Sequence, residues 1–167
     1  RASLGQGRLT AASLIKLYIM GAVYSSYDNI AAANGQEQVD KLLNAMITVS
    51  DNDSANTLVG MLGNGDNAAG QEAVNTYCKN NGYTDTSMGR MLLEKASANE
   101  NYTSARDCSV FLKNIYENKL EHSEDMLNLL KQQTRTEKIP KGIPSGVETA
   151  NKTGELDHVE NDAAIVF

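Results

Sequence analysis

The chain has 167 residues, which is enough for one compact domain with a hydrophobic core and short for two. Apolar residues make up 41% and charged residues 22%, a balance typical of a folded chain rather than a disordered one. The formal net charge of -6 argues against a nucleic-acid-binding protein, and no apolar stretch is long enough to span a membrane.

Helical periodicity dominates most of the chain. An apolar segment from Leu14 to Tyr24 predicts a first helix, and apolar residues recur at helical spacing over 39–47 and 55–62. Residues 63–70 are rich in Gly, Asn and Asp and predict a turn. The following segment, 72–80, predicts another helix that ends near the next glycine.

Two further helices are predicted before the first proline. Cys108 to Tyr116 carries an apolar stripe, and Ser104 with Asp107 three residues later is close to a capping box that would start this helix. Ser123 is expected to cap one more helix, which continues through Gln133.

The pattern changes after Pro140, where prolines and glycines alternate and break any helix. Val147–Lys152 and Ala163–Phe167 predict two strands, which can pair across a turn near 156–159. The expected fold class is α+β, with a helical body and a hairpin in a single domain over 1–167. A lone hairpin is marginal in water, so its strands must pack on the helices or on strands outside this chain.

The cysteines and histidines of the sequence do not decide whether the protein has a disulfide, and they show no metal-binding pattern. Cys78 and Cys108 can form a disulfide in an exported protein or remain as buried thiols, and their spacing does not decide between the two. His122 and His158 are isolated, and no paired-cysteine zinc pattern is present. Neither a metal nor a cofactor is therefore expected.

Ser13 and Lys16 are the first candidates for catalysis. They lie three residues apart at the start of the predicted helix, so they share one face, with the hydroxyl at the positive end of the helix dipole. A serine needs a neighbouring base to become a nucleophile, and a desolvated lysine can serve. Such a pair also arises by chance, although Ser13 is the only serine followed by lysine three residues later.

Two more motifs carry candidate side chains. Ser50-Asp51-Asn52 lies between two predicted helices, where the ordinary interpretation is a helix cap. Lys152-Thr153-Gly154 ends the first predicted strand, where the ordinary interpretation is a turn glycine. In the functional interpretation, the lysine and threonine bind a substrate carboxylate, and the glycine lets the substrate backbone approach the strand.

Together the three motifs resemble a known set. Ser-x-x-Lys, Ser-Asp-Asn and Lys-Thr-Gly occur in this order in class A β-lactamases and penicillin-binding proteins. The likeness runs from about Ala12 to the last residue and includes 47–56 around the second motif and 161–165 after the third. The chain thus resembles the class A β-lactamase-like branch of the serine penicillin-recognising superfamily.

The resemblance implies a serine hydrolase that forms an acyl-enzyme with β-lactams or D-Ala-D-Ala peptides, without a metal or cofactor. It implies that Ser13 attacks the carbonyl and that Lys16 takes its proton, directly or through water. It also implies that Ser50 relays a proton to the leaving nitrogen, with Lys152 nearby.

The same resemblance implies the substrate contacts. Asn52 would hold the side-chain amide of the substrate and steady the first lysine. Lys152, Thr153 and Gly154 would form the strand that binds the substrate carboxylate. The backbone N–H groups of the nucleophile and of Glu155 would form the oxyanion hole, which is usually the largest contribution in acyl transfer.

Deacylation is the first point at which the chain departs from this family. Its true β-lactamases carry a loop glutamate followed by proline, which activates the hydrolytic water, whereas the stretch from Arg90 to Ser104 looks shorter and lacks the Glu-Pro pair. Glu94 is the one candidate base, and a solvated loop charge is the preferred interpretation. We therefore expect slow deacylation. The alternatives to a β-lactamase are a D,D-peptidase, a penicillin-binding protein, a non-enzymatic β-lactam sensor or an inactive fragment.

Length is the second departure. The family's sheet has strands before the nucleophile helix, and a strand and a helix beyond the point where this sequence stops. We expect an incomplete sheet with exposed edges, completed by further sequence or by a second copy, so self-association is an option. The resemblance also implies a secreted or extracytoplasmic protein, with a membrane anchor as an option, because peptidoglycan and β-lactams are met there.

Overall fold

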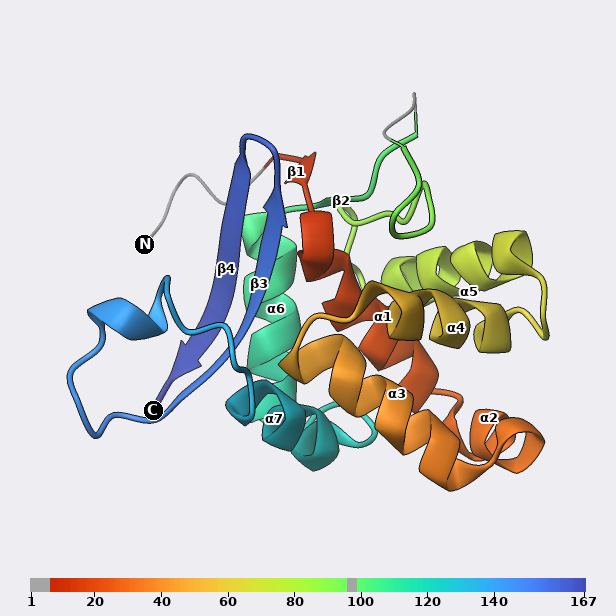
Figure 1. The fold of residues 1–167 in the computed structure, drawn as a ribbon, viewed down its shortest axis with the longest axis horizontal. Helices are drawn as coiled ribbons and strands as arrows, with labels where there is room; N and C mark the ends of the chain where they lie inside the picture. The colour runs from red at the N-terminus through yellow and green to blue at the C-terminus, as the bar shows by residue number, and fades with distance from the viewer. Residues whose placement is uncertain (1–6, 96–98) are drawn as a thin grey trace.

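The computed structural model describes residues 7–95 and 99–167 and consists of a helical body with a β-hairpin along one side (Figure 1). Its helices are α1 (Ile15–Tyr24), α2 (Tyr27–Asn34), α3 (Gln36–Thr48), α4 (Asn52–Leu62), α5 (Asn67–Asn80), α6 (Ala105–Tyr116) and α7 (Ser123–Lys131). Its antiparallel strand pairs are β1 (Leu9–Thr10) with β2 (Tyr102–Thr103), and β3 (Thr149–Leu156) with β4 (Val159–Val166). The predicted α+β class is confirmed.

Helix α1 is the buried centre of the helical body. All ten of its residues are buried, as expected for a helix that is apolar on nearly every side. It packs against α3, α4 and α5, which lie around it in Figure 1. The ring of Tyr18 in α1 lies 5.3 Å from the rings of Tyr83 and Phe111, so aromatic packing also ties α1 to α6. This packing holds the residues at the start of α1 in place.

The β3–β4 hairpin lies against the start of α1. The two strands are joined at Asp157-His158, and their register pairs Lys152 with Ala163. Strand β3 packs on α7 and on η1 (Ala12–Leu14), the 3-10 turn that leads into α1, while β4 packs on α6. The hairpin is therefore stabilised by the helical body, as the sequence required.

Capping residues set the starts of two helices. Helix α5 begins at Asn67, inside the segment that the sequence predicted as a turn, because Asp66 accepts hydrogen bonds from two backbone N–H groups of its first turn. The prediction for α6 is confirmed, since Oγ of Ser104 accepts the N–H of Asp107 at 3.1 Å. A capping side chain can therefore start a helix inside a segment whose Gly, Asn and Asp content predicts a turn.

The predicted role of Ser123 is wrong. Helix α7 begins at Ser123, with His122 in the capping position, and it ends at Lys131 rather than Gln133. His122 has a φ of +58° and turns the chain sharply into the helix. The Ser123 hydroxyl is used in the preceding turn, where it donates to the carbonyl of Leu120 and accepts the N–H of the same residue.

Two further elements differ from the prediction. Helix α2 has no predicted counterpart, because Ile30 is its only buried residue and it shows no apolar stripe. Strand β3 continues to Leu156, so Lys152-Thr153-Gly154 lies inside the strand rather than at its end. Pairing with β4 along the whole length explains the longer strand.

Both cysteines are free and buried, Cys78 in α5 and Cys108 in α6, which is the second of the two predicted alternatives. Burial raises the pKa of Cys78 to about 12, so this thiol stays protonated at neutral pH. None of the helices within the described ranges combines the length and the apolar character that crossing a membrane would require.

Candidate active site

Ser13 lies in η1, the short turn before α1. The preceding residue, Ala12, has a φ of +49°, a left-handed conformation that alanine rarely adopts and that costs backbone energy. Ser13 is partly exposed, whereas Ala12 and Leu14 on either side are buried. The strained turn thus presents the Ser13 hydroxyl at the surface while its neighbours anchor the turn in the core.

Gly154 of β3 lies directly against this turn. A Cβ atom at Gly154 would come within 2.7 Å of the Ala11 carbonyl oxygen, 3.0 Å of the Leu14 nitrogen and 3.1 Å of the Ser13 nitrogen. These are backbone atoms of a packed turn, which cannot move aside cheaply. The sequence interpretation gave this glycine a role in admitting the substrate backbone, which stays a prediction, and the structure adds that Gly154 admits the backbone of the turn that carries Ser13.

Lys16 is fully buried, and its Nζ connects two of the sequence motifs. Nζ lies 3.1 Å from Oγ of Ser13 and 3.0 Å from Oγ of Ser50. It also donates to the Ser50 carbonyl oxygen at 2.6 Å and to Oδ1 of Asn52 at 2.7 Å. The start of α1 and the α3–α4 junction therefore meet at one nitrogen.

The α3–α4 junction contains three polar residues, of which one caps α4 and two contact Lys16. Asp51 caps α4 by accepting the N–H of Ser54 at 2.7 Å, so the capping interpretation holds for this residue. Ser50 has a φ of +62°, and this left-handed conformation separates it from both helices. Ser50 and Asn52 are thereby free to contact Lys16, so capping and a polar site coexist in one short segment.

Lys152 approaches the same serine from the other side. It is fully buried in β3, and its Nζ donates to Oγ of Ser50 at 2.9 Å and to the carbonyl oxygen of Thr153 at 2.9 Å. The Ser50 hydroxyl thus lies between the two lysine nitrogens. Thr153 follows Lys152 in the strand and is almost fully buried. Residues from all three sequence motifs are therefore in hydrogen-bonding contact.

The two lysines share an unusual electrostatic setting. Burial lowers the pKa of Lys16 to about 8, with Asp51 acting in the opposite direction and Arg135 adding to the lowering. Burial also lowers the pKa of Lys152 to about 7, with the charges of Lys16 and Arg135 contributing. The pair therefore begins to lose its ionising protons near neutral pH, Lys152 before Lys16 because its pKa is lower.

The contacts of Lys16 serve its protonated form and also its neutral form, which the lowered pKa makes accessible near pH 8. The Ser50 carbonyl and Oδ1 of Asn52 can only accept hydrogen bonds, so they take the two hydrogens of an uncharged Nζ. Nζ also lies within donating distance of the Ser13 and Ser50 hydroxyl oxygens, and when it is neutral its lone pair can accept the proton of one of these hydroxyls. This arrangement can remove the proton from the Ser13 hydroxyl, which is what a serine nucleophile requires.

A cavity of about 530 Å³ opens beside Ser13. Asn52 and Glu155 line it close to the nucleophile, and residues between 90 and 101 form much of the remaining wall, with Glu94 among them. This size is typical of pockets for small molecules. The predicted site residues thus lie in the polar cluster or in the wall of this cavity, except Gly154, which packs against the turn that carries Ser13.

Glu94 lines the cavity, but its carboxylate forms a hydrogen bond within its own loop. It is exposed, and its carboxylate accepts the N–H of Met91 at 3.1 Å. The buried residue at this point of the loop is Leu92, which the side chain of Asn56 in α4 holds through both its N–H and its carbonyl group, each at 2.9 Å. Leu92, held by the Asn56 amide, and Ser13 therefore line the same cavity.

Two site residues had no assigned role in the sequence interpretation. Asn56 follows Asn52 by one helical turn, and this spacing was a usable signal, because residues four apart share a helix face. Arg135 lies in the loop after α7, with its guanidinium 3.8 Å from the Glu155 carboxylate, and it lowers the pKa of both buried lysines. No feature of the sequence around Arg135 predicts that it belongs to the site.

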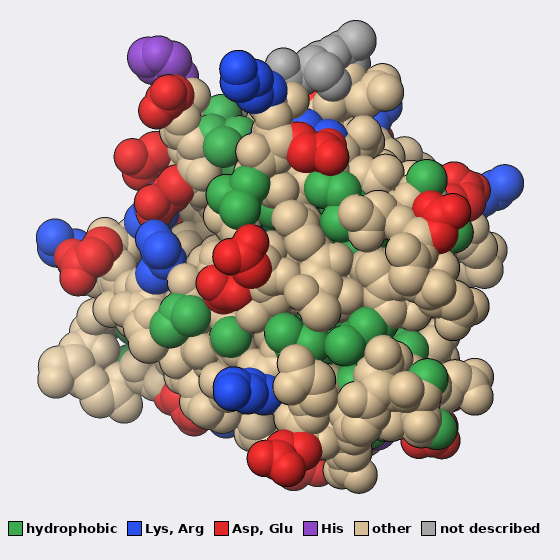
Figure 2. All heavy atoms as spheres, turned by 45° about the vertical axis from the view of Figure 1, so that its right-hand side comes forward, with side chains coloured by type: hydrophobic (Ala, Val, Ile, Leu, Met, Phe, Trp, Pro, Cys, Tyr) green, Lys and Arg blue, Asp and Glu red, His purple; other side chains and the backbone are tan. Residues whose placement is uncertain are grey.

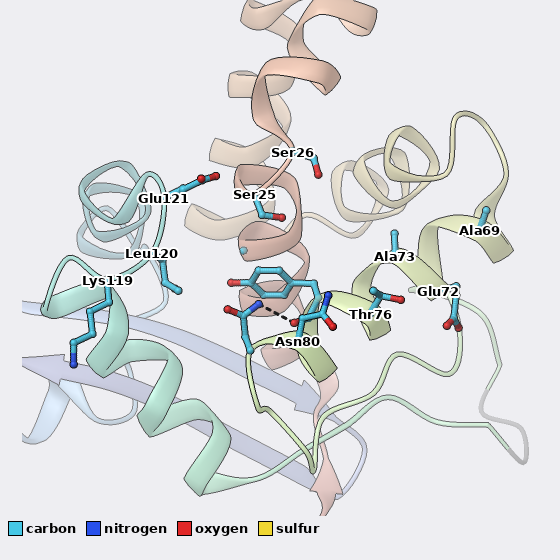
Figure 3. Close-up of a pocket in the computed structure, with 13 residues that line it drawn as sticks. Ser25, Ser26, Ala69, Glu72, Ala73, Thr76, Asn80, Lys119, Leu120 and Glu121 are labelled. Carbon is cyan, nitrogen blue, oxygen red and sulfur yellow. Dashed lines mark hydrogen bonds between the residues drawn. The ribbon is translucent and has the colours of Figure 1, made fainter.

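A hollow larger than the cavity beside Ser13 lies elsewhere. It has a volume of about 730 Å³ and lies between the end of α1, helix α5 and the α6–α7 loop. Figure 3 shows Ser25, Glu72, Asn80 and Lys119 around it, and none of the predicted site residues lines it. Size alone therefore does not identify the site, whereas the grouping of serines and buried lysines does.

Comparison with known proteins agrees with this geometry. The sequence matches the β-lactamase enzyme family over residues 29–167, a range that contains Ser50, Asn52 and Lys152. The chain belongs to the β-lactamase enzyme family. The predicted likeness to this family is confirmed by that match, and the solved structures that share its fold include class A β-lactamases.

Three of those structures are representative. A β-lactamase from Sphaerobacter thermophilus is 24% identical with a TM-score of 0.80, and the match covers 98% of this chain and 72% of that protein. A putative class A β-lactamase from Rhodopseudomonas palustris is 21% identical with a TM-score of 0.82, covering 98% and 73%. A leucine-to-glutamate mutant of PBP-A, solved as an acyl-enzyme complex with penicillin G, is 22% identical with a TM-score of 0.81, covering 97% and 69%.

At these identities the structural matches establish the fold of this β-lactamase family member. No protein with a curated description matches the chain. In the part of the chain that the structure describes, no group of three or more His, Cys, Asp or Glu side chains is arranged to hold a metal ion. The polar cluster around Ser13 holds the serine hydroxyls and the buried lysines that α1, the α3–α4 junction and β3 bring together.

Proposed function

We propose that this protein is a serine hydrolase of the β-lactamase type, which forms an acyl-enzyme at Ser13 with β-lactams or D-alanyl peptides. One observation carries the proposal. The buried Nζ of Lys16 lies within 3.1 Å of both the Ser13 and Ser50 hydroxyls, and Lys152 reaches the same Ser50 from the opposite side. This cluster contains a nucleophile, a base and a path for the proton.

Acylation follows from these contacts. Neutral Lys16 takes the hydroxyl proton of Ser13 as Oγ forms a bond to the carbonyl carbon of the substrate. The C–N bond then breaks, and the leaving nitrogen takes a proton from Ser50, which is replenished from the lysines on either side. The backbone N–H groups of Ser13 and Glu155 stabilise the negative oxygen of the tetrahedral intermediate.

Substrate contacts divide between two sides of the nucleophile. Asn52 holds the amide of the acyl side chain, and its other contact, with Lys16, fixes its orientation. Lys152 and Thr153, both buried in β3 of the free protein, are proposed to bind the carboxylate on the leaving-group side. Arg135 adds positive charge there, because it is close enough to lower the pKa of both lysines.

We further propose that the acyl-enzyme is cleared slowly. The loop presents buried Leu92 next to the cavity, and the Glu94 carboxylate is occupied by the Met91 N–H. Neither arrangement gives a water-activating base beside Ser13, which favours the behaviour of a penicillin-binding protein or D,D-peptidase over that of an efficient β-lactamase. The penicillin G acyl-enzyme of the PBP-A mutant supports a stable adduct in this fold.

Mass spectrometry of the intact protein after exposure to benzylpenicillin tests the proposal. We expect an adduct of one penicillin on Ser13 in the unmodified chain and none in Ser13→Ala, with Ser109→Ala, an exposed serine of α6, as the matched control. Lys16→Ala should slow acylation by at least about 10²-fold, the usual contribution of a general base. A wild-type chain that folds but carries no adduct would sink the catalytic interpretation.

Nitrocefin hydrolysis separates the alternatives for deacylation. A single burst, stoichiometric with protein, is expected for slow deacylation, and steady turnover would identify a β-lactamase. If turnover is seen, Glu94→Gln decides whether Glu94 is the base, because removing the base should leave the burst and abolish the steady phase. A permanent adduct without turnover of any peptide would instead identify a β-lactam sensor.

We also propose an extracytoplasmic location, since the proposed substrates occur there. Self-association through the β3–β4 sheet is a further proposal. Its motivation is that β4 pairs only with β3 among the described residues, which leaves its other edge open.

A further inference from the structure

The contact between Ser50 and Lys152 joins two segments that are far apart in the sequence. Ser50 follows the end of α3, and Lys152 lies in β3, with Nζ of the lysine 2.9 Å from Oγ of the serine. A lysine side chain is long and flexible, so it does not fix this distance by itself. The distance depends on how the backbone at the end of α3 is held relative to β3.

Gln133, which follows α7, bridges these two segments. Helix α7 packs on both α3 and β3 and lies between them in Figure 1. Nε2 of Gln133 donates to the carbonyl oxygen of Ile47 at 3.0 Å and to that of Asn151 at 3.3 Å. Ile47 lies in the last turn of α3, three residues before Ser50, and Asn151 directly precedes Lys152. One amide nitrogen therefore connects the backbones on both sides of the Ser50–Lys152 contact.

The residues around Gln133 reinforce this bridge. Oε1 of Gln133 accepts the N–H of Arg135 at 3.0 Å, which fixes the orientation of the amide. Thr134 donates its N–H at 3.0 Å and its hydroxyl at 2.8 Å to the carbonyl oxygen of Thr48. The side chain of Asn151 donates to the carbonyl oxygen of Arg135 at 3.1 Å. The last carbonyl groups of a helix have no partner within it, so this segment caps α3 while it is bonded to β3.

Burial makes the amide of Gln133 a structural requirement rather than a surface contact. The charged side chains on the face shown in Figure 2 lie at the surface, where water solvates them. Gln133 is buried, so its amide and the carbonyl groups that it contacts find their partners inside the protein. Loss of this side chain would leave the Ile47 carbonyl without this hydrogen bond and release the end of α3 from β3.

We propose that Gln133 is a positioning residue for the proton relay of acylation, and that it holds Ser50 and Lys152 at the distance at which the leaving nitrogen is protonated. The inference rests on the proposed acyl transfer at Ser13 and adds a residue to it. Gln133 does not line the cavity beside Ser13, so it acts through the two backbones that it connects.

The chemistry of the leaving group provides a specific readout. When the C–N bond of a β-lactam breaks, the nitrogen takes the proton of the Ser50 hydroxyl, and Ser50 takes one from Lys152. When the C–S bond of a thiolester breaks, the sulfur leaves with the electron pair as a thiolate and needs no proton. A fault in the relay should therefore slow acylation by a β-lactam and spare acylation by a thiolester, whereas general damage to the site should slow both.

Benzylpenicillin and phenylacetylglycyl thioglycolate form the pair of acyl donors for the experiment. Both carry a phenylacetylamino group on the acyl side and a carboxylate on the leaving group, and they differ in the leaving atom. Gln133→Met keeps the length of the side chain and removes its hydrogen bonds. In single-turnover experiments, adduct formation with benzylpenicillin should slow by at least about 10-fold, while thiol release from the thiolester should stay within about three-fold of the unmodified chain.

Two further variants control the experiment. Gln132→Met is the matched control, because Gln132 is the exposed neighbour and its amide donates to the Asn128 carbonyl of its own helix; both rates should stay unchanged. Gln133→Asn keeps an amide on a shorter side chain, so it should show the same selective effect with a smaller loss. The thiolester rate also reports whether each variant folds.

A double-mutant cycle with Ser50→Ala tests whether Gln133 acts through the relay. Ser50→Ala removes the hydroxyl that protonates the leaving nitrogen, so it should itself slow benzylpenicillin more than the thiolester. Adding Gln133→Met to this variant should slow benzylpenicillin by less than about two-fold, because residues that act in one network do not have additive effects.

The outcomes separate this inference from the proposed function. Absence of Ser13 acylation by both donors in the unmodified chain overturns the proposed function and the role of Gln133 with it. Acylation of the unmodified chain, combined with equal losses for both donors, no loss, or full additivity with Ser50→Ala, overturns the role of Gln133 alone. A loss confined to benzylpenicillin, and absent once Ser50 is replaced, supports it.

Discussion

Lys16 and Lys152 have no exposed surface, yet each keeps its nitrogen hydrogen-bonded to oxygen atoms of the site. Burying a charged ammonium is costly, and the protein meets this cost by lowering both pKa values toward neutrality. Arg135 contributes to both shifts, so a residue outside the sequence motifs tunes the reactivity of two residues inside them. The site thus gains a base without exposing it to water.

The acylation rate should show a bell-shaped dependence on pH. Below about 7 both lysines are protonated and Ser13 lacks a base, whereas above about 8 both are neutral and the leaving nitrogen lacks a proton source. The maximum is expected between these values. Acylation by benzylpenicillin, measured from low to high pH with circular dichroism as a check on folding, gives the profile.

Arg135→Gln provides the control for this profile. Removing the positive charge should raise both lysine pKa values and move both limbs toward higher pH, because Arg135 lowers each of them in the native protein. A wild-type rate that keeps increasing as the pH falls below 6, or limbs that stay in place in the variant, would contradict the assignment of the two lysines.

The contact between η1 and β3 is the arrangement of elements on which the site depends. Strand β3 brings Lys152 to Ser50, and the same strand supports the strained turn that carries Ser13. Gly154 allows this close approach because it lacks a Cβ atom. The contact of one strand with one turn therefore positions Ser13, the proposed nucleophile, and Lys152, which reaches Ser50.

Gly154→Ala should damage both stability and acylation. The new Cβ would meet backbone atoms of Ala11, Ser13 and Leu14, and relieving such an overlap typically costs about 1–3 kcal/mol. The turn must move away from β3, so acylation should slow by about 10-fold or more. Urea unfolding and the rate of acylation by benzylpenicillin measure the two effects.

Gly142→Ala is the matched control, because a Cβ at Gly142 would meet nothing within 4 Å. We expect this variant to keep the free energy of unfolding and the acylation rate of the unmodified chain. Equal behaviour of the two alanine variants would mean that the turn does not depend on its contact with β3.

At the scale of the whole molecule, the β3–β4 hairpin is the element of the described structure that keeps an unpaired strand edge and exposed apolar side chains. Among the described residues β4 pairs only with β3, and Leu156, Val166 and Phe167 keep large exposed apolar surfaces. Open strand edges and exposed apolar side chains both favour association with another chain. The helical body, in contrast, buries its apolar residues around α1.

Self-association through this sheet predicts an average mass that rises with protein concentration in sedimentation velocity. Val166→Lys should reduce the association, because a lysine at a strand edge opposes pairing with a second strand. Ala68→Lys, on the exposed start of α5, adds the same charge away from the sheet and should have no effect. A monomer at all concentrations would rule the association out.

Local sequence was sufficient for the parts of this protein that depend on neighbouring residues. Helical spacing placed Ser13 and Lys16 on one face, and capping chemistry placed the start of α6 at Ser104. The order of the three motifs was sufficient for the family and for the fold class. Where the local signal was weak, as in α2, or misleading, as at Ser123, the prediction failed.

Contacts between distant segments decided the rest. The position of Ser50 between two lysine nitrogens, the support of the nucleophile turn by Gly154 and the influence of Arg135 on both pKa values arise only when α1, the α3–α4 junction and β3 pack together. Burial and long-range charge depend on which segments meet in space, and no spacing along the chain records them. Tertiary packing, not the motif residues alone, therefore turns Ser13 and Lys16 into a candidate nucleophile and base.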